Sequence, residues 1–300
     1  MRSPLARGLA WAVGLLWCGV ALAAPASAPG AAASAVSAPP AQAVAQRVVS
    51  LAPHLTELVY AAGGGSKLLA VSRYSDYPAA AQKLPVIGDA FTLDYEELLR
   101  LKPDLILAWK GGTPKRQLDK LRELKLPVRE IDVQRIDDVS KVLREFGTWM
   151  GTQPQADAAA NAYDAQIAQL RARYAGLPQV PVFYEIWDVP LMTVGRQHVI
   201  DEAIHLCGGS NIFHALDAIT ATVSRESVVA RKPAVIVTGD SLAESAARMR
   251  RGWQRMTQVP AVANNRIATI DGDLLNRMGP RLAQGVAALC AAIDSARQAH

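Results

Sequence analysis

Cysteine is scarce in this 300-residue chain, which has only Cys18, Cys207 and Cys290. Aromatic residues make up only 6% of it, and after the N-terminus no apolar run approaches the roughly 20 residues that cross a bilayer. The 32 basic and 27 acidic residues are interspersed, without a basic cluster. We therefore expect no nucleic-acid partner and no membrane-spanning segment in the mature chain.

Common enzyme and metal-site motifs are missing as well. The chain has no GxSxG elbow and no nucleophile beside a recognisable base, which argues against a hydrolase. The histidines show no HxxxH or other tight ligand spacing; they are His54, His198, His205, His214 and His300. We expect no catalysis, no cofactor and no dedicated zinc or manganese site.

The N-terminus has the pattern of an export signal. Two arginines precede the apolar run GLAWAVGLLWCGVALA and small residues end it, so residues 1–23 are predicted to be a signal peptide cleaved before Ala24. Trp17 stands where a bacterial lipoprotein signal has a small residue before its cysteine, so a lipid anchor at Cys18 is the weaker alternative. The Ala/Pro/Ser-rich residues 24–46 have too little bulky side chain to fold and are predicted to be a flexible linker.

Two cysteines remain after export, Cys207 and Cys290. An even number of cysteines in an oxidising compartment predicts one disulfide, joining two C-terminal helices across a long loop. Two buried thiols are the alternative.

Short β-branched runs alternate with helical patterns from residue 47 onward, which is typical of α/β folds. Residues 47–152 are predicted to form one α/β lobe, in which a helix begins at Thr113-Pro114. Residues 153–176 are predicted to form one long helix, because they are rich in helix formers and carry large apolar residues four, three and four apart. Residues 177–300 return to the α/β pattern and are predicted to form a second lobe.

The two predicted lobes share a stretch of sequence. EELLRLKPDLILAW begins at Glu96, and ESVVARKPAVIVTG begins 130 positions later at Glu226. In each, Asp94 or Ser224 can cap a short helix, and Lys-Pro ends the helix before a buried strand. Acids favour helix N-termini without any function, but a matched pair on two similar lobes also fits a two-fold-related partner.

These residues resemble the periplasmic cobalamin-binding proteins of ATP-driven importers, within the wider group of iron-siderophore, haem and corrinoid receptors. The motifs that carry the resemblance are RVVSLAPHLTEL, SRYSDYP, AQKLP, LKPDLILAW, CGGSNIF and VSRE, and it extends almost to the C-terminus. It implies two Rossmann-like α/β lobes with largely parallel sheets, bridged by one long helix, with the ligand in the cleft between them.

The same resemblance implies partners and a location. It places the protein in the periplasm as a monomer that carries a corrinoid, most simply cobalamin, to the permease of an ABC importer in the inner membrane. One acid from each lobe docks on the permease in that family, and these acids fall on Glu96 and Glu226. The resemblance also implies a disulfide between Cys207 and Cys290.

Aromatic and polar residues are the candidates for the ligand cleft, because a corrinoid is a broad, nearly flat ring fringed with amides. The resemblance assigns this role to Tyr74, Trp109, Trp187, Asp273 and Arg277. Core packing is the alternative for Tyr74 and Trp109, and an (i, i+4) ion pair is the alternative for Asp273 and Arg277. His54 could touch the ligand, although a loop hydrogen bond is the preferred interpretation.

The chain departs from the family at two positions. Where related sequences have a further tryptophan, this chain has Ala90 within Asp89-Ala90-Phe91, and it has Thr220 before VSRE. Phe91 and Trp187 could replace these two aromatic walls, and the pocket could otherwise be wider or suit a different corrinoid.

Other functions stay open from the sequence. Haem or a ferric siderophore is the main competitor within the group, since Tyr74 could bind iron through its phenolate. The absence of a dense arginine cluster argues against anionic siderophores. A secreted hydrolase and a ligand-sensing module are the remote alternatives.

Overall fold

The computed structural model describes residues 43–240 and 242–297. The predicted signal peptide and residues 24–42 of the predicted linker lie outside this range. Across the described residues, no helix combines the length and the apolar character that a bilayer span requires.

The first lobe is built on a four-stranded parallel sheet in the order β2-β1-β3-β4. The strands are β1 (Val48–Ser50), β2 (Leu68–Val71), β3 (Leu105–Trp109) and β4 (Val128–Ile131). Helices α2 (Tyr95–Leu101) and α3 (Lys115–Glu123) cover one face of this sheet, and α1 (Pro53–Ala61) and α4 (Asp138–Met150) cover the other. Two short 3-10 turns complete the lobe, η1 (Gly65–Lys67) and η2 (Ala79–Lys83).

The second lobe has a six-stranded mixed sheet in the order β10-β9-β5-β6-β8, with β7 beside β5. The strands are β5 (Val180–Asp188), β6 (Leu191–Val194), β7 (Gly209–Asn211), β8 (Thr220–Thr222), β9 (Val235–Gly239) and β10 (Ile267–Ile270). β5, β7, β9 and β10 run parallel, in line with the predicted largely parallel sheet, whereas β6 and β8 form an antiparallel ribbon. The sequence did not predict this ribbon, because its strands are short and β8 consists of a threonine, an alanine and a threonine.

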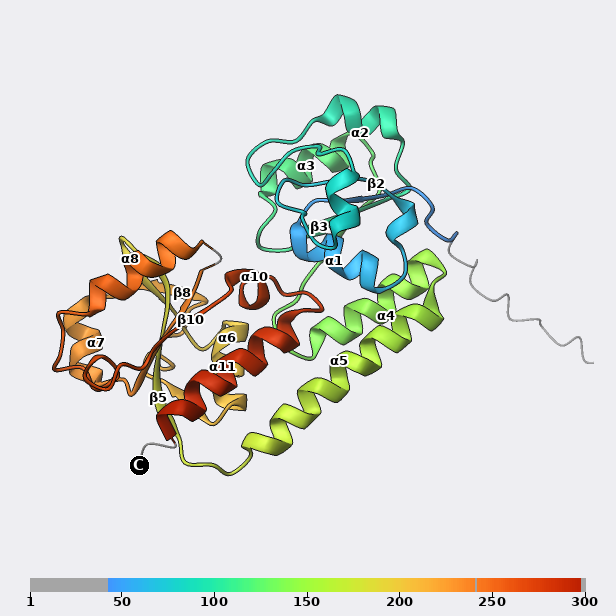
Figure 1. The fold of residues 1–300 in the computed structure, drawn as a ribbon. Helices are drawn as coiled ribbons and strands as arrows, with labels where there is room; N and C mark the ends of the chain where they lie inside the picture. The colour runs from blue at the N-terminus through green and yellow to red at the C-terminus, as the bar shows by residue number, and fades with distance from the viewer. Residues whose placement is uncertain (1–42, 241, 298–300) are drawn as a thin grey trace, which may run out of the picture. The chain divides into compact units, whose positions relative to one another are not determined.

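Helices cover both faces of the second sheet. α6 (Val199–Leu206) and α11 (Leu282–Arg297) lie on one face, and α7 (Arg225–Arg231), α8 (Ala243–Trp253) and α9 (Pro260–Ala263) lie on the other. The short α10 (Gly272–Leu275) follows β10 directly. Figure 1 shows the elements of the two lobes with α4 and α5 running between them.

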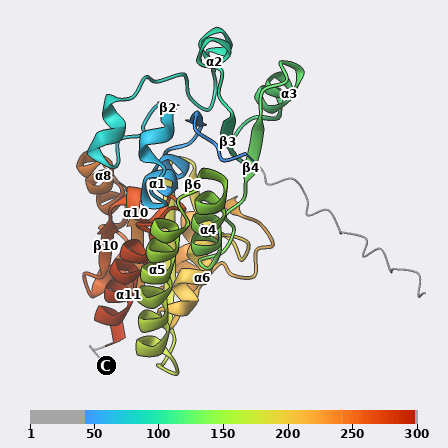
Figure 2. The same ribbon diagram turned by 90° about the vertical axis from the view of Figure 1, so that its right-hand side faces the viewer.

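The predicted long helix is α5 (Gln153–Tyr174). Its apolar stripe is buried as expected, with Tyr163, Ile167 and Tyr174 almost inaccessible. α5 packs side by side with α4 and also contacts α1, α6 and α11 (Figure 2). One continuous apolar core therefore runs from the first sheet past α5 to the second.

The repeated sequence forms the same unit twice. The Asp94 carboxylate accepts from the Glu97 N–H at 2.9 Å at the start of α2, and the Ser224 hydroxyl accepts from the Ser227 N–H at 3.2 Å at the start of α7. Both helices end in a left-handed lysine, Lys102 with φ 45° and Lys232 with φ 48°. The predicted capping is confirmed in both lobes.

The predicted start of the next helix was wrong by one or two residues. α3 begins at Lys115, and its N-cap Pro114 offers no side-chain hydrogen bond. The hydroxyl of Thr113 instead accepts from the N–H of Trp109 at 3.0 Å. Thr113 therefore fixes the end of β3 rather than capping α3.

The disulfide between Cys207 and Cys290 is present, with a separation of 83 residues. It joins the C-terminal end of α6 to the middle of α11, the two helices that lie on the α5 side of the second sheet. Both cysteines are fully buried, so the predicted link is confirmed as part of the core.

Candidate functional site

A cavity of about 720 Å³ lies between the two lobes. The first lobe supplies Trp109 to Gly111 and residues 132–134. The second supplies its remaining walls: Ile186, Trp187, residues 197–199, Ile219, Thr220, Gly239, Asp240, Gly272, Asp273, Asn276 and Met278. β3 and β9 both end at this cavity with their carboxyl ends, the edge at which open α/β sheets bind ligands.

Trp109 is the last residue of β3 and forms one wall of the cavity. Its backbone N–H donates to the hydroxyl of Thr113. Its ring packs edge-on against His54, with the ring centroids 5.1 Å apart. The ring also lies over Gly112, where a β-carbon would come within 1.8 Å of it. These contacts fix the orientation of the indole before any ligand arrives.

Tyr74, Ala90 and Phe91 lie on the other side of Trp109. They line a smaller hollow of about 190 Å³ that Trp109 shares with the main cavity. Tyr74 is 71% exposed and Phe91 is 80% exposed, so neither contributes to the core. Tyr74 also has a φ of 66°, a left-handed conformation that is uncommon for a bulky residue and often marks functional loops.

Trp187 lines the main cavity from β5, together with Thr220 of β8. The indole is 53% exposed, and its N–H donates to the Val189 carbonyl at 2.9 Å. Both positions at which the chain departs from related sequences thus border a hollow: Thr220 lines the main cavity, as Trp187 does, and Ala90 lines the smaller hollow with Phe91.

Asp273 and Arg277 differ in their position relative to the cavity. Asp273 lines the cavity, whereas Arg277 is not among the residues that line it. The two form the (i, i+4) ion pair considered as an alternative, with 3.0 Å between Arg277 Nη2 and Asp273 Oδ2. Arg277 also contacts two acids of the first lobe, Asp76 at 2.6 Å and Glu57 at 3.3 Å.

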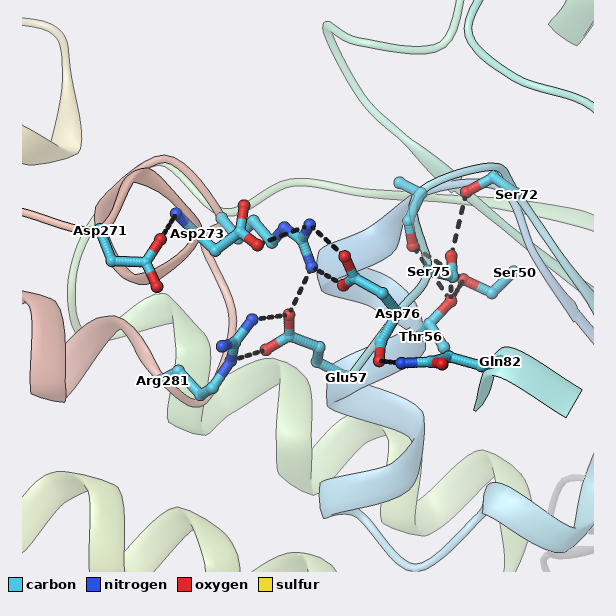
Figure 3. A network of polar contacts seen from close by, with 12 residues as sticks. Ser50, Thr56, Glu57, Ser72, Ser75, Asp76, Gln82, Asp271, Asp273 and Arg281 are labelled. Atoms are coloured by element: carbon cyan, nitrogen blue, oxygen red, sulfur yellow. Dashed lines mark hydrogen bonds and ion pairs between the residues drawn. The ribbon is translucent and has the colours of Figure 1, made fainter. Parts of the chain in front are cut away.

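These contacts belong to a polar network that joins the lobes, which we call the interlobe latch (Figure 3). Its members are Glu57, Asp76, Asp273, Arg277 and Arg281. The Glu57 carboxylate, only 2% exposed, accepts two hydrogen bonds from Arg281 at 2.7 and 2.8 Å. The Arg277 guanidinium beside Asp76 lowers the pKa of that carboxyl.

Sequence reasoning missed most of the latch. Glu57 is a charged residue within the apolar helix sequence LTELVY, a position that calls for a buried partner. Its partners lie more than 200 residues away, however, and local sequence carries no signal of such a pairing.

The charges around the main cavity are mostly negative. Lys110 and Asp132 form an ion pair at 2.8 Å, and Asp240 and Asp273 add two further carboxylates. One positive and three negative groups thus give a formal charge of −2. Burial lowers the pKa of His198, which also lines the cavity, to about 4, so this ring is neutral at physiological pH.

His54 lies behind Trp109. Burial, reinforced by the charge of Arg277, lowers its pKa to about 4. Its Nε2 has no hydrogen-bond partner among the described residues, so the preferred loop hydrogen bond is not found at this atom. The ring serves chiefly to support the indole of Trp109.

Glu96 and Glu226 occupy the first turns of α2 and α7, and both are exposed. Within residues 43–240 and 242–297, neither carboxylate has an ion-pair partner. The pKa of Glu226 is lowered by hydrogen bonds to its carboxylate from the backbone N–H of Glu226 and from the Ser224 hydroxyl. Both acids are therefore exposed at equivalent positions of the repeated unit.

Comparison with known families gives a match over most of the chain. Residues 48–274 match the model of the periplasmic binding protein family. A vitamin B12-binding protein of Yersinia pestis is 39% identical over 84% of this chain and 87% of its own length.

Two solved structures are similar to this one. A periplasmic vitamin B12 binding protein of Vibrio cholerae is 35% identical, with a TM-score of 0.77 over 85% of this chain and 98% of that chain. A periplasmic haem binding protein of Pseudomonas aeruginosa is 28% identical, with a TM-score of 0.73 over 83% of this chain and 93% of that chain.

Proposed function

The chain belongs to the periplasmic binding protein family, and we propose that it captures cobalamin or a related corrinoid and delivers it to an importer in the inner membrane. The observation that carries the proposal is the cavity between the lobes, with Trp109 on one side and Trp187 on the other. Vitamin B12-binding relatives from two genera support the choice of ligand.

The size and chemistry of the cavity suit a flat, amide-fringed ring. Its volume of about 720 Å³ lies in the range of small-molecule sites, roughly 300 to 1,000 Å³. Indole faces provide broad apolar contact, and polar groups at the rim, such as Gln134, Gln197 and Asn276, can hydrogen-bond to amides. Preformed lobes linked by a continuous core imply small rocking movements on binding rather than a wide hinge closure.

Haem is the second candidate, favoured by the similar haem-binding structure and by Tyr74, whose exposed phenol could ligate iron. Electrostatics weigh against it. Haem carries two carboxylates, and a cavity with a formal charge of −2 would repel them. Arg277 offers little compensation, because three carboxylates already surround it.

Calorimetric titration of the purified mature protein with cyanocobalamin, cobinamide and haemin tests the proposal. We expect saturable 1:1 binding of at least one corrinoid and a red complex that survives gel filtration. Saturable binding of haemin without either corrinoid would instead establish the second candidate. The absence of binding by all three ligands would refute both.

Delivery requires docking on a permease, and we propose Glu96 and Glu226 for this role. Each is an exposed carboxylate at the start of a capped helix, and the two helices are equivalent parts of a repeated unit. Two arginines presented by a two-fold-related pair of permease subunits would complement them.

The remaining parts of the proposal concern location and architecture. Residues 1–23 would direct export to the periplasm, where the protein acts as a monomer, and residues 24–46 would link the cleaved end to the lobes. We place the boundaries of the lobes at residues 47–152 and 177–300, with the bridging helix between them. Binding without catalysis accords with the family.

A further inference from the structure

A cluster of two imidazoles and one carboxylate lies outside the cavity, at the end of α6. We propose that Asp201, His205 and His214 form a binding site for a divalent metal ion of the zinc type. One nitrogen of each ring and one oxygen of the carboxylate all lie within 4.8 Å of one another. None of the three residues lines the main cavity, so the site is independent of the proposed corrinoid.

The distances fit a shared ion. Asp201 Oδ2 is 2.9 Å from His214 Nδ1 and 3.5 Å from His205 Nδ1. Ligand atoms on a tetrahedral zinc ion with bonds of 2.0 to 2.1 Å are about 3.3 Å apart. His205 Nδ1 also lies 2.8 Å from the Asp201 carbonyl oxygen, so binding through this nitrogen would exchange a hydrogen bond for a metal bond.

Asn211 holds the carboxylate of Asp201 in place. Asp201 is buried, and its second oxygen, Oδ1, accepts from Asn211 Nδ2 at 2.7 Å. The same Asn211 nitrogen donates to the Val194 carbonyl at 3.0 Å, and Asn211 Oδ1 accepts from the Phe213 N–H at 2.9 Å. A hydrogen-bonded partner that orients a metal-binding carboxylate is the usual arrangement in protein metal sites.

The set of donor atoms selects the type of ion. Imidazole nitrogens with one carboxylate oxygen suit zinc and similar transition metals, whereas calcium and magnesium prefer sites made only of oxygen atoms. Both imidazoles are exposed, which leaves room for a water or another ligand in the fourth position. Cys207 nearby is held in the disulfide and cannot compete as a thiolate.

The spacing of the histidines alone does not indicate this cluster, because one of its three members is an aspartate. Asp201 and His205 stand four apart on one helical turn, and His214 follows nine residues later, after the short β7. His214 begins the segment that leads to Ile219 and Thr220 in the cavity wall. A bound ion would link α6 to this segment and stiffen that wall.

Zinc titration of the tag-free mature protein, stripped of metal by a chelator, tests the site. We expect one equivalent of Zn²⁺ bound in competition with a chromogenic chelator, and a higher melting temperature with Zn²⁺ present. Co²⁺ in place of Zn²⁺ should give the visible absorption of a site with fewer than six ligands.

Single variants then locate the ion. His205→Ala and His214→Ala should each weaken Zn²⁺ binding by more than the roughly 10- to 100-fold typical of losing an outer hydrogen bond. Both side chains are exposed, so the fold should survive. Asp217→Asn is the matched control, since this exposed acid lies on the same segment and pairs with Arg196, and it should change nothing. The absence of saturable Zn²⁺ binding by the wild type, or wild-type affinity for Zn²⁺ in both histidine variants, would overturn the site and leave only carboxylate–imidazole hydrogen bonds.

Discussion

The two lobes repeat one α/β unit but differ where its strand reaches the cavity. β3 ends in Trp109, and the equivalent residue at the end of β9 is Gly239. A β-carbon on Gly239 would lie 1.9 Å from the Tyr184 hydroxyl, so the second lobe has no room for a side chain there. The repeat therefore fixes the scaffold and the exposed acids, while single residues at the strand ends give the cavity two different walls.

The lobes also differ in what holds them together. The first sheet is wholly parallel and its lobe contains no cysteine, whereas the second is mixed and carries the disulfide. Burial also shifts the pKa of a side chain of opposite type in each lobe: it lowers the pKa of His54 in the first and raises that of Glu185 in the second. These differences allow the two lobes to be perturbed separately.

Removing the disulfide should have the largest effect. Replacing Cys207 and Cys290 together by alanine should lower the free energy of unfolding by about 4 to 5 kcal/mol, because the closed loop is long. Chemical denaturation measures this change. Reductant should lower the stability of the wild type in the same way and leave the double variant unaffected; equal stability of the two proteins would show that the link contributes nothing.

Glu185 should make the second lobe less stable at high pH. Burial raises its pKa to about 7, while the N–H of Trp253 and the charge of Arg225 oppose this rise and Asp188 adds to it. The unfolded chain loses this proton near its ordinary pKa of 4.5, so the contribution to stability present below pH 4.5 is lost as the pH rises to about 7.

Glu185→Gln should therefore be more stable than the wild type at pH 8, by about 3 kcal/mol, and nearly equal to it at pH 4.5. Thermal unfolding at both pH values measures this. His54 in the first lobe has the opposite sign, since its lowered pKa adds stability above pH 6.5 that is lost as the pH falls to about 4. A pH-independent difference between the Glu185 variant and the wild type would contradict the account.

The interlobe latch should respond unequally to loss of its two first-lobe acids. Glu57→Gln should cost about 2 to 3 kcal/mol, since it removes the carboxylate that pairs with Arg281 and one of the three that surround Arg277. Asp76→Asn is the matched control, because its carboxylate is 50% exposed and should contribute less than about 1 kcal/mol. If urea denaturation shows the same loss of unfolding free energy for both variants, the buried carboxylate of Glu57 contributes no more to stability than the exposed one of Asp76.

Trp109→Ala should weaken corrinoid binding by more than about 1 kcal/mol, measured by calorimetry, because its indole lines the cavity and can pack against the ligand. Trp149→Ala provides the control, since this half-buried indole on α4 lies away from the cavity and stacks with Arg129. An unchanged dissociation constant for Trp109→Ala would remove that residue from the site.

The smallest effect on binding is expected from the paired acids. Glu96→Ala combined with Glu226→Ala should leave the dissociation constant unchanged and impair uptake by cells that depend on the protein. Glu123→Ala combined with Glu244→Ala, two exposed acids outside the repeated positions, should affect neither. Loss of binding in the first pair would reject the docking assignment.

The sequence predicted those parts of the molecule that depend on residues close together in the chain or on simple residue counts. The capped helices of the repeat, the apolar stripe of α5 and the disulfide all follow from short-range spacing or from a simple count. The family resemblance supplied what local patterns do not, namely the position of the ligand cleft between the two lobes.

Most of the rest depends on contacts between distant segments. Arg277 looked like a cavity residue but is occupied by acids from the other lobe. Asp201 and His214 meet only because β7 brings the chain back beside α6. None of these pairings can be predicted from the local sequence.

A crystal structure of the protein saturated with cyanocobalamin tests the central claim most directly. We predict a corrin ring between the lobes, in contact with Trp109 on one side and Trp187 on the other. A ligand bound to an outer face of either lobe, with the cavity filled only by solvent, would contradict it.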